Sequence, residues 1–321
     1  MKAARWVGVG QVGCEEVPAP PVAGGEILVR TAYASICGSD LHTVFLGAPP
    51  MGGPASYIGH EGAGEVVESR CAGFEPGDRV LTVPHALVGR CLAEYQALPG
   101  SACIRLPSGV PLSHLLMAQQ LGTVVFALRY HPVDVTGKDA AVIGQGSAGA
   151  FFTFLLKRAG AARVLVSDKS PARLAYARAL GADVAVDVGT GDFGAAVRAA
   201  TAGRGADVVV EAVGSRETFP QSLELAAAGA TVIWFGLPEG TDDYPFSFGE
   251  FFRRHLTAYS AAGAQSEPGL ESFRYAVRLI EDGAIDVAPL LSHMLPIEEV
   301  GAAFRIAHDR TDNALKVSIK F

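Results

Sequence analysis

The sequence predicts an α/β fold in two parts, a β-rich unit and a doubly wound parallel sheet, and three observations support this prediction. The chain has 321 residues, more than one domain usually holds, so two hydrophobic cores are expected. Its first part, to about residue 116, carries short β-type runs between Gly and Pro turn signals. From residue 139 onward, apolar runs alternate with helical stretches, which favours parallel strands joined by helices.

The individual elements follow from local patterns. The first part is expected to be a small all-β unit, with strands at runs such as 27–29 and 64–67. One later helix has clear limits, because Ser170 is a good N-cap, Pro171 suits the first helical position and Gly181 follows the last turn. The candidate strands of the second part are 140–143, 164–167, 184–188, 208–211, 231–235 and 256–260. Helices at 269–282 and 297–308 and a strand at 315–321 are expected to close the chain.

Composition and charge exclude several classes of protein. Asp and Glu outnumber Lys and Arg by 33 to 26, and the net charge of -7 leaves no basic field for nucleic acid. No apolar run is long enough to span a bilayer and the start lacks a secretory signal, so we expect a cytoplasmic protein with small-molecule partners. The five cysteines are widely spaced without a Cys-x-x-Cys pair, which argues against a disulfide framework.

A glycine-rich turn, Gly144-Gln145-Gly146-Ser147-Ala148-Gly149, follows the candidate strand 140–143 and opens a helical stretch. In such a turn the first glycine permits the tight bend, the second leaves room for a pyrophosphate and the third packs the helix on the sheet. The amide groups at the start of the helix favour the anion. The alternative is an ordinary glycine-rich turn without a ligand, but the position of the motif between strand and helix favours a dinucleotide site.

The second strand of this unit ends in Asp168, 24 residues after Gly144, where the dinucleotide fingerprint has an acid that binds the adenosine ribose. A carboxylate there repels a 2'-phosphate, so NAD is preferred over NADP. Lys169 follows directly and softens that repulsion, and the alternative for Asp168 is a solvated surface acid. The expected cofactor contacts from this part are Gly144, Gly146, Ser147, Ala148, Gly149, Asp168, Lys169 and Arg173.

The β-rich part contains two residue types that zinc prefers. Cys37 begins the run Cys-Gly-Ser-Asp-Leu-His, and His60 lies 23 residues beyond it in Gly-His-Glu. A catalytic zinc site needs a third protein ligand and an open position. Taken alone, Cys37 is as well explained as a small buried residue and His60 as a loop histidine with its hydrogen bonds satisfied.

The wider pattern of motifs resembles the zinc-dependent alcohol dehydrogenases of the medium-chain dehydrogenase/reductase superfamily. The motifs are Cys-Gly-Ser-Asp-Leu-His (37–42), Gly-His-Glu-Gly-Ala-Gly-Glu-Val-Val (59–67), Gly-Asp-Arg-Val (77–80), Ala-Glu-Tyr (93–95), the glycine turn, Leu-Gly-Ala-Asp (180–183) and Asp-Val-Val-Val-Glu-Ala-Val-Gly (207–214). The likeness covers nearly the whole chain. It implies a GroES-like β-rich catalytic domain from residues 1–117 and 266–321, with a Rossmann dinucleotide-binding domain, 118–265, inserted between.

The resemblance also implies roles for residues near Cys37 and His60, which would be zinc ligands. Ser39 would bond the substrate hydroxyl and His42 would continue the proton relay, although Asp40 and His42 also fit a solvated loop. Asp40 would orient His60 through its ring N–H. Glu61 would lie beside the metal as a supporting or alternate ligand. Backbone groups around 235–237, including Gly236 and Leu237, would contact the nicotinamide.

Two departures from the family pattern stand out. The lobe that holds a structural zinc in many members is missing between residues 80 and 93, so one catalytic zinc and no second zinc is expected. The third ligand position, 25 residues before Gly144, holds Gln119 where the family has Cys, Glu or Asp. Glu61 supplies the missing carboxylate, or Gln119 binds the metal directly, or the site is weakly occupied, or the glutamines only cap a helix. A neutral amide would leave a more positive metal.

The sequence therefore predicts an NAD-dependent oxidation of an alcohol, or reduction of its ketone or aldehyde, in a homo-oligomer. The rival within the superfamily is a zinc-independent quinone or enone reductase, against which Cys37 and His60 argue. The rival from another class is a protein that binds the dinucleotide without turnover. Residues 45–57 and 84–89 are expected to line the substrate cleft, and no motif names the substrate.

Overall fold

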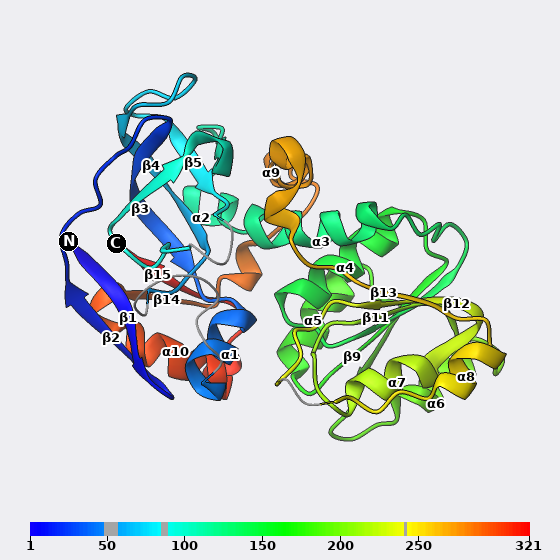
Figure 1. Cartoon of the computed structure of the whole chain (residues 1–321). Helices are drawn as coiled ribbons and strands as arrows, with labels where there is room; N and C mark the ends of the chain where they lie inside the picture. Colours follow the sequence, from blue (N-terminus) through cyan, green and yellow to red (C-terminus); the bar gives the residue numbers. More distant parts are fainter. Residues whose placement is uncertain (48–56, 85–88, 241–242) are drawn as a thin grey trace. The chain divides into compact units, whose positions relative to one another are not determined.

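The computed structural model describes residues 1–47, 57–84, 89–240 and 243–321. The chain divides into two compact units, the first formed by Met1–Thr123 with Gly263–Phe321 and the second by Val124–Ala262 (Figure 1). Most of the expected cleft segments, at 48–56 and 85–88, lie outside the described residues. No helix in the described part of the chain has the length and apolar character needed to cross a membrane.

The first unit is built on a mainly antiparallel sheet with the strand order β14-β15-β3-β4-β5-β7, in which β6 also pairs with β3. The strands are β3 (Glu26–Ser35), β4 (Glu61–Ser69), β5 (Arg79–Thr82), β6 (Tyr95–Pro99), β7 (Cys103–Arg105), β14 (His293–Pro296) and β15 (Val317–Lys320). A separate hairpin joins β1 (Lys2–Gly8) to β2 (Gln11–Glu16). The last strand, β15, pairs antiparallel with β3 and so brings the end of the chain to its first part.

Helices of the first unit are α1 (Gly38–Leu46), α2 (Leu112–Leu115), α9 (Glu271–Glu281) and α10 (Val300–Asp309). One hydrophobic core unites α1, α10 and the end of the chain through residues such as Val44, Phe304 and Ile319, all of which are buried. Short 3-10 turns lie at Gly100–Ala102, Ala264–Ser266, Pro268–Leu270, Ala288–Leu290, Ile297–Glu299 and Thr311–Asn313.

The expectation of an all-β first part is wrong at residues 38–46, which form the helix α1, and at the short helix α2. For α1 the cause is local, because Cys37 is the N-cap and the Asp40 carboxylate accepts a hydrogen bond from the Cys37 backbone amide at 2.9 Å. This reciprocal arrangement satisfies amide groups that would otherwise be unpaired at the helix start. The helix fixes the positions of Ser39 and His42 relative to Cys37.

The second unit is a parallel sheet of order β10-β9-β8-β11-β12-β13. Its strands are β8 (Asp139–Ile143), β9 (Arg163–Asp168), β10 (Val184–Asp187), β11 (Ala206–Glu211), β12 (Ala226–Trp234) and β13 (Thr257–Ser260). The helices are α3 (Ala118–Tyr130), which begins in the first unit, α4 (Ser147–Arg158), α5 (Pro171–Ala179), α6 (Phe193–Ala200), α7 (Thr218–Leu225) and α8 (Phe248–Arg253). The pair α4 and α5 covers one face of the sheet and the pair α6 and α7 the other (Figure 1).

Because helices cover both faces, every residue of β8 is buried. The chain leaves β8 toward β9 on one side and returns to β11 on the other, so the strand order reverses between β8 and β11. In such sheets ligands bind beyond the carboxyl ends of the strands at this reversal. The expected strands are confirmed, with end shifts of a few residues, and so is the expected helix: Ser170 caps α5 by accepting a hydrogen bond from the Arg173 amide at 3.4 Å.

Candidate active site

A cluster of possible metal ligands forms where β3 ends and β4 begins. Ser35 of β3 pairs with Glu61 of β4, so Cys37, two residues after Ser35, comes close to His60 and Glu61. One possible ligand atom from each of Cys37, His60 and Glu61 lies within 4.8 Å of the others, and no other such group of three is found in the described ranges. A thiolate, an imidazole and a carboxylate are donors that zinc takes, so these residues fit the metal.

Asp40 contacts the His60 ring at its Nδ1 atom. Its Oδ1 lies 3.5 Å from His60 Nδ1 and also accepts a hydrogen bond from the Gly59 amide at 3.3 Å. Both side chains are buried. Burial opposes a charged imidazole, but the nearby Asp40 and Cys37 outweigh it and raise the pKa of His60 well above its ordinary value. With Nδ1 directed at Asp40, the other ring nitrogen is the one available to a metal.

The segment that stands in place of the missing lobe packs directly on the histidine loop. The Cys91 amide donates to the Gly59 carbonyl at 3.0 Å. A Cβ atom added at Gly89 would lie 2.5 Å from the Gly59 carbonyl oxygen and 2.9 Å from the Cβ of His60. Only glycine fits at position 89 without moving this loop, so residues 89–91 support the position of His60.

Glu61 is fully buried and its carboxylate has two partners. Its Oε2 accepts hydrogen bonds from the Ser35 hydroxyl and from Lys316 Nζ, the latter at 2.6 Å. The Lys316 side chain is only 3% exposed, and its Nζ also donates to Gln120 Oε1 at 3.3 Å. Sequence reasoning missed Lys316 because alternation with the buried Val317 and Ile319 places it on the expected solvent face of the last strand.

Gln119 lies in the first turn of α3 and is buried, with an exposed fraction of 2%. Its Nε2 atom has no hydrogen-bond partner among the residues that the structure describes. Of the two ends of this amide, only the oxygen could bind a metal cation.

Ser39 and His42 both belong to α1 and are partly buried. Their spacing of three positions puts them on one side of the helix. Both residues lie in the short helix that begins directly after Cys37. The roles that the sequence suggests for them, hydrogen bonding to a substrate hydroxyl and proton relay, stay predictions.

The glycine turn in the second unit forms a cradle at the carboxyl end of β8. Gly144 has φ of 86°, a left-handed conformation that favours glycine. A Cβ atom at Gly149 would lie 1.9 Å from the Gly144 carbonyl oxygen, so no other residue fits there. At Gly146 the nearest other heavy atom to such a Cβ would be Arg173 Nη1, 4.0 Å away, so the turn is open on that side. This open, amide-lined turn at the start of α4 fits a pyrophosphate.

Asp168 ends β9 beside this turn and is mostly buried. Its Oδ2 accepts a hydrogen bond from the Gln145 amide at 2.7 Å, and its Oδ1 accepts one from the Ser170 amide at 2.8 Å. Arg173 Nη1 lies 3.9 Å from Asp168 Oδ2. The acid therefore has a fixed position, and it ties the glycine turn to the start of α5. Lys169, the next residue, is exposed.

Two loops at the carboxyl ends of β11 and β12 interlock around Glu211. The buried Glu211 carboxylate accepts hydrogen bonds from the amides of Val213 and Gly214 at 2.8 and 2.9 Å. Its backbone carbonyl accepts one from the Gly236 amide at 2.9 Å. A Cβ atom at Gly214 would lie 2.0 Å from the Leu237 carbonyl oxygen. Glu211 thus fixes the backbone at Gly236 and Leu237, a supporting role that the sequence did not single out.

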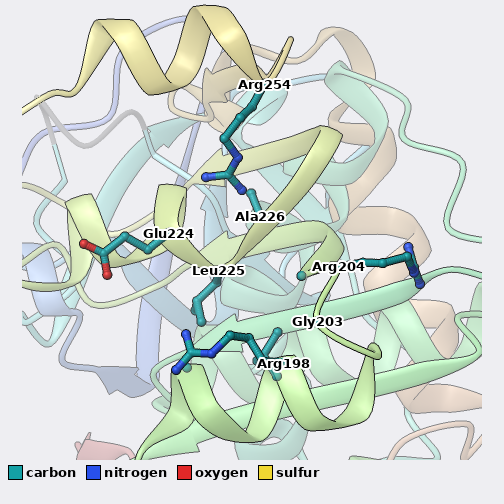
Figure 2. A pocket seen from close by; sticks show the side chains of 10 residues that line it. Arg198, Gly203, Arg204, Glu224, Leu225, Ala226 and Arg254 are labelled. Atoms are coloured by element: carbon teal, nitrogen blue, oxygen red, sulfur yellow. The ribbon is translucent and has the colours of Figure 1, made fainter.

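A cavity of about 260 Å³ also lies in the second unit, but at the opposite edge of the sheet (Figure 2). Gly205 and Ala226, at the amino ends of β11 and β12, are among its lining residues. Arg254 Nη1 donates to the Leu223 carbonyl at 2.9 Å, and Arg204 Nη2 donates to Asp139 at 3.0 Å. These guanidinium groups stabilise the protein itself, and the cavity lies away from the edge where such sheets bind ligands.

Comparisons with known proteins find matches for both the first part of the chain and the part that contains the parallel sheet. Residues 23–119 match the alcohol dehydrogenase GroES-like domain, and residues 149–282 match the zinc-binding dehydrogenase family. The chain is 30% identical to the L-threonine 3-dehydrogenase of Bacillus licheniformis, with 91% of each chain covered. It is 27% identical to an alcohol dehydrogenase of Cupriavidus necator, with 100% of this chain and 98% of the other covered. The fold is similar to that of the alcohol dehydrogenase from Thermus sp. ATN1, with a TM-score of 0.86, 25% identity and coverage of 100% and 99%.

Proposed function

Because the chain belongs to the zinc-dependent alcohol dehydrogenase family of the medium-chain dehydrogenase/reductase superfamily, we propose that Cys37 and His60 hold its catalytic metal. The protein is an oxidoreductase that transfers hydride between an alcohol, or its ketone or aldehyde, and a nicotinamide dinucleotide. The observation that carries the assignment of the site is the approach of Cys37, His60 and Glu61 to within 4.8 Å in a buried position.

The residues around the metal have separable roles in this proposal. When bound, zinc would supply a Lewis acid for the substrate oxygen and the nicotinamide dinucleotide would supply the hydride acceptor. Asp40 fixes the His60 ring by its contact with Nδ1. Ser39 binds the substrate hydroxyl and passes its proton to His42 as the alcohol is oxidised, and His42 releases the proton to water. The third metal ligand is Glu61 or Gln119.

For the cofactor we propose NAD in preference to NADP, bound by the residues that the sequence indicated. These are Gly144, Gly146, Ser147, Ala148, Gly149, Asp168, Lys169, Arg173, Gly236 and Leu237. The support is the fixed carboxylate of Asp168 beside the open side of the glycine turn. A phosphate on the ribose would meet this negative charge.

The cofactor preference is tested by replacing Asp168 with serine. We expect kcat/KM for NAD to fall roughly tenfold or more and that for NADP to rise, because one charge repels the extra phosphate and two backbone hydrogen bonds weaken. Lys169→Ala is the matched control, because it should lower the use of NADP more than that of NAD and so shift the ratio in the opposite direction. An unchanged ratio of NAD to NADP use in Asp168→Ser would contradict the proposal.

The substrate is proposed to be a small primary or secondary alcohol. The relatives named above act on an amino alcohol, threonine, and on alcohols, which places simple alcohols, polyols and amino alcohols in the first assay panel. We further propose a homo-oligomer, because β13 lies at the edge of its sheet and α8, just before it, exposes Phe248 and Phe252. The domain limits 1–117 with 266–321 and 118–265, and a cytoplasmic location, are part of the same proposal.

The metal assignment is tested by chelation. Protein stripped of metal should lose NADH formation from its alcohol and regain it with added zinc. Full activity without metal on a quinone or an enone would favour the zinc-independent reductase. Binding of NAD by zinc-loaded protein without turnover of any alcohol, ketone or aldehyde would favour a protein that only binds the dinucleotide.

A further inference from the structure

The end of the connection between β5 and β6 packs against the loop that carries His60. The Cys91 amide donates to the Gly59 carbonyl at 3.0 Å, and the Leu92 amide donates to the Ile58 carbonyl at 3.4 Å. The side chains of Cys91 and Leu92 are both buried. Two backbone hydrogen bonds therefore set the position of the segment that leads into His60.

The Cys91 side chain joins a group of buried polar side chains from three strands. Its thiol donates to Gln96 Oε1 at 3.2 Å, and Gln96 Nε2 donates to Thr31 Oγ1 at 2.8 Å. Thr82 Oγ1 lies 3.5 Å from the sulfur, and it is the donor of this contact because the thiol hydrogen is already directed at Gln96. The four side chains are at most 2% exposed, so each depends on the others for its hydrogen bonds.

These four side chains, which we call the Cys91 network, also contact the residue directly after the ligand candidates. A Cβ atom added at Gly62 would lie 2.6 Å from Thr82 Oγ1 and 3.2 Å from the Cβ of Cys91. The loop 59–62 is therefore held at both ends, by the hydrogen bond to the Gly59 carbonyl and by the packing against Gly62.

The chemical state of Cys91 suits a hydrogen-bond donor and not a metal ligand. Burial raises the pKa of its thiol to about 12, against a smaller opposing effect of the Thr82 hydrogen bond. A metal binds the thiolate and not the thiol. Cys91 is also not a member of the cluster of possible ligands in the described part of the chain. It can therefore act on the metal only through the backbone that it holds.

We infer that Cys91, held by Gln96, is a positioning residue that fixes the loop of His60 for metal binding. This inference rests on the proposed metal site. The thiol keeps residues 89–92 in place, and their backbone hydrogen bonds fix residues 58 and 59 in turn. When the thiol loses its partner, the loop has to be ordered as the metal binds, and this cost lowers the metal affinity.

The test measures binding of Co²⁺ in place of zinc, because its visible absorption reports the ligands and their geometry. Cys91→Ala removes the donor, Gln96→Leu removes its acceptor, and Cys91→Ser restores a donor of similar size. Thr201→Val is the matched control, since it also removes hydrogen bonds of a buried side chain, but in the other unit. Each variant is titrated with Co²⁺ against a coloured chelator, and thermal unfolding followed by circular dichroism records its fold and stability.

Cys91→Ala and Gln96→Leu should weaken Co²⁺ binding roughly tenfold and shift the absorption bands, because residues that orient metal ligands contribute about this much to affinity. Cys91→Ser should stay within about twofold of wild type, since its hydroxyl can donate to Gln96 and accept from Thr82. Thr201→Val should be less stable than wild type and should bind Co²⁺ with unchanged affinity and bands.

Wild-type affinity and bands in folded Cys91→Ala and Gln96→Leu would overturn the inference. An equal loss of affinity in Thr201→Val would do so too, by showing that metal binding only follows stability. Loss of thiolate-to-cobalt absorption in Cys91→Ser would overturn it by showing that Cys91 is itself a ligand. If Cys91→Ala does not fold, Gln96→Leu beside Thr201→Val decides. Wild-type protein that binds neither Co²⁺ nor zinc would instead refute the proposed function.

Discussion

The glycine turn and the metal site are built in opposite ways. The turn belongs to one β-strand, the helix after it and the end of the next strand, and its key contacts use backbone groups of Gly144, Gly149 and Gln145. The metal site instead joins side chains from the end of β3, the start of β4 and the start of β15. The first depends on space that only glycine leaves, and the second depends on charges that must balance when buried.

This difference predicts how each site fails. A substitution in the turn should act through steric fit and leave the metal site in place. A substitution in the metal site should act through charge and ligand number and leave cofactor binding in place. The following predictions test that separation, from the largest expected effect to the smallest.

Replacing Cys37 with alanine removes the single thiolate of the metal site. We expect kcat/KM to fall by about a thousandfold or more, because the Lewis acid supplies several kcal/mol to the reaction. Affinity for NAD, measured by fluorescence titration, should change little. Cys14→Ala is a matched control, because Cys14 lies on β2 outside the cluster. A Cys37→Ala enzyme that keeps its activity would refute the metal role of this residue.

Gly149 and Gly146 form a matched pair within the turn. Gly149→Ala places a Cβ 1.9 Å from a carbonyl oxygen and should destabilise the protein by about 1–3 kcal/mol. Gly146→Ala has space in the folded protein, so its stability should stay near wild type while affinity for NAD falls roughly tenfold, since the methyl group occupies the pyrophosphate site. Thermal unfolding and NAD titration separate the two. Equal effects on stability would contradict this account of the turn.

Gln119→Glu tests the third ligand. If Gln119 binds the metal, a carboxylate at the same place should raise zinc affinity by roughly tenfold, because zinc prefers an anionic oxygen. Competition with a chelator measures the change, and Gln120→Glu, one residue further along the same helix, is the comparison. Unaltered zinc affinity in Gln119→Glu would show that this residue does not reach the metal.

The smallest expected effect comes from replacing Asp183, which lies in the same unit as the glycine turn. It pairs with Lys157 Nζ at 2.9 Å and accepts from the Val164 amide at 2.7 Å. Burial is the largest single influence and opposes the ionised form, but the hydrogen bonds from Lys157 and the Val164 amide, with the charges of Lys157 and Arg163, together outweigh it and lower the pKa of Asp183 from 3.8. The stabilisation is therefore complete above the ordinary value and is lost as the pH falls through the lower folded value.

Because the pair is one-third exposed and screened by water, its contribution should stay below about 1 kcal/mol. Urea unfolding of Asp183→Asn should show a small loss of stability at neutral pH that vanishes in acid. A loss that persists in acid would assign the effect to packing or to the amide hydrogen bond.

The contrast between the sites also explains what the sequence could predict. The strand, glycine spacing and terminal acid of the turn lie within one stretch of chain, so local periodicity and turn chemistry reveal them together. The N-cap Ser170 of α5 was predicted on the same grounds and is confirmed. These residues are close together in the sequence and also in the folded unit.

The metal site was less accessible to such reasoning. The structure brings Cys37, His60 and Glu61 together, yet the balance of charge among them depends on Lys316, 255 positions beyond Glu61. Alternation with Val317 and Ile319 alone would place this lysine on the solvent face of a strand. It is buried because β15 lies between β14 and β3, a pairing that no local pattern contains. The helix α1 was missed for a different reason, because its cap, formed by Cys37 and Asp40, is local but lies in a stretch that was interpreted as part of an all-β unit.

The measurement that tests the central claim most directly is the zinc content of purified wild-type protein beside that of Cys37→Ala, with NADH formation from an alcohol followed in the same samples. We predict one zinc per wild-type chain, and loss of both zinc and activity in the variant. Metal-free wild-type protein that oxidises its alcohol at full rate would contradict the account.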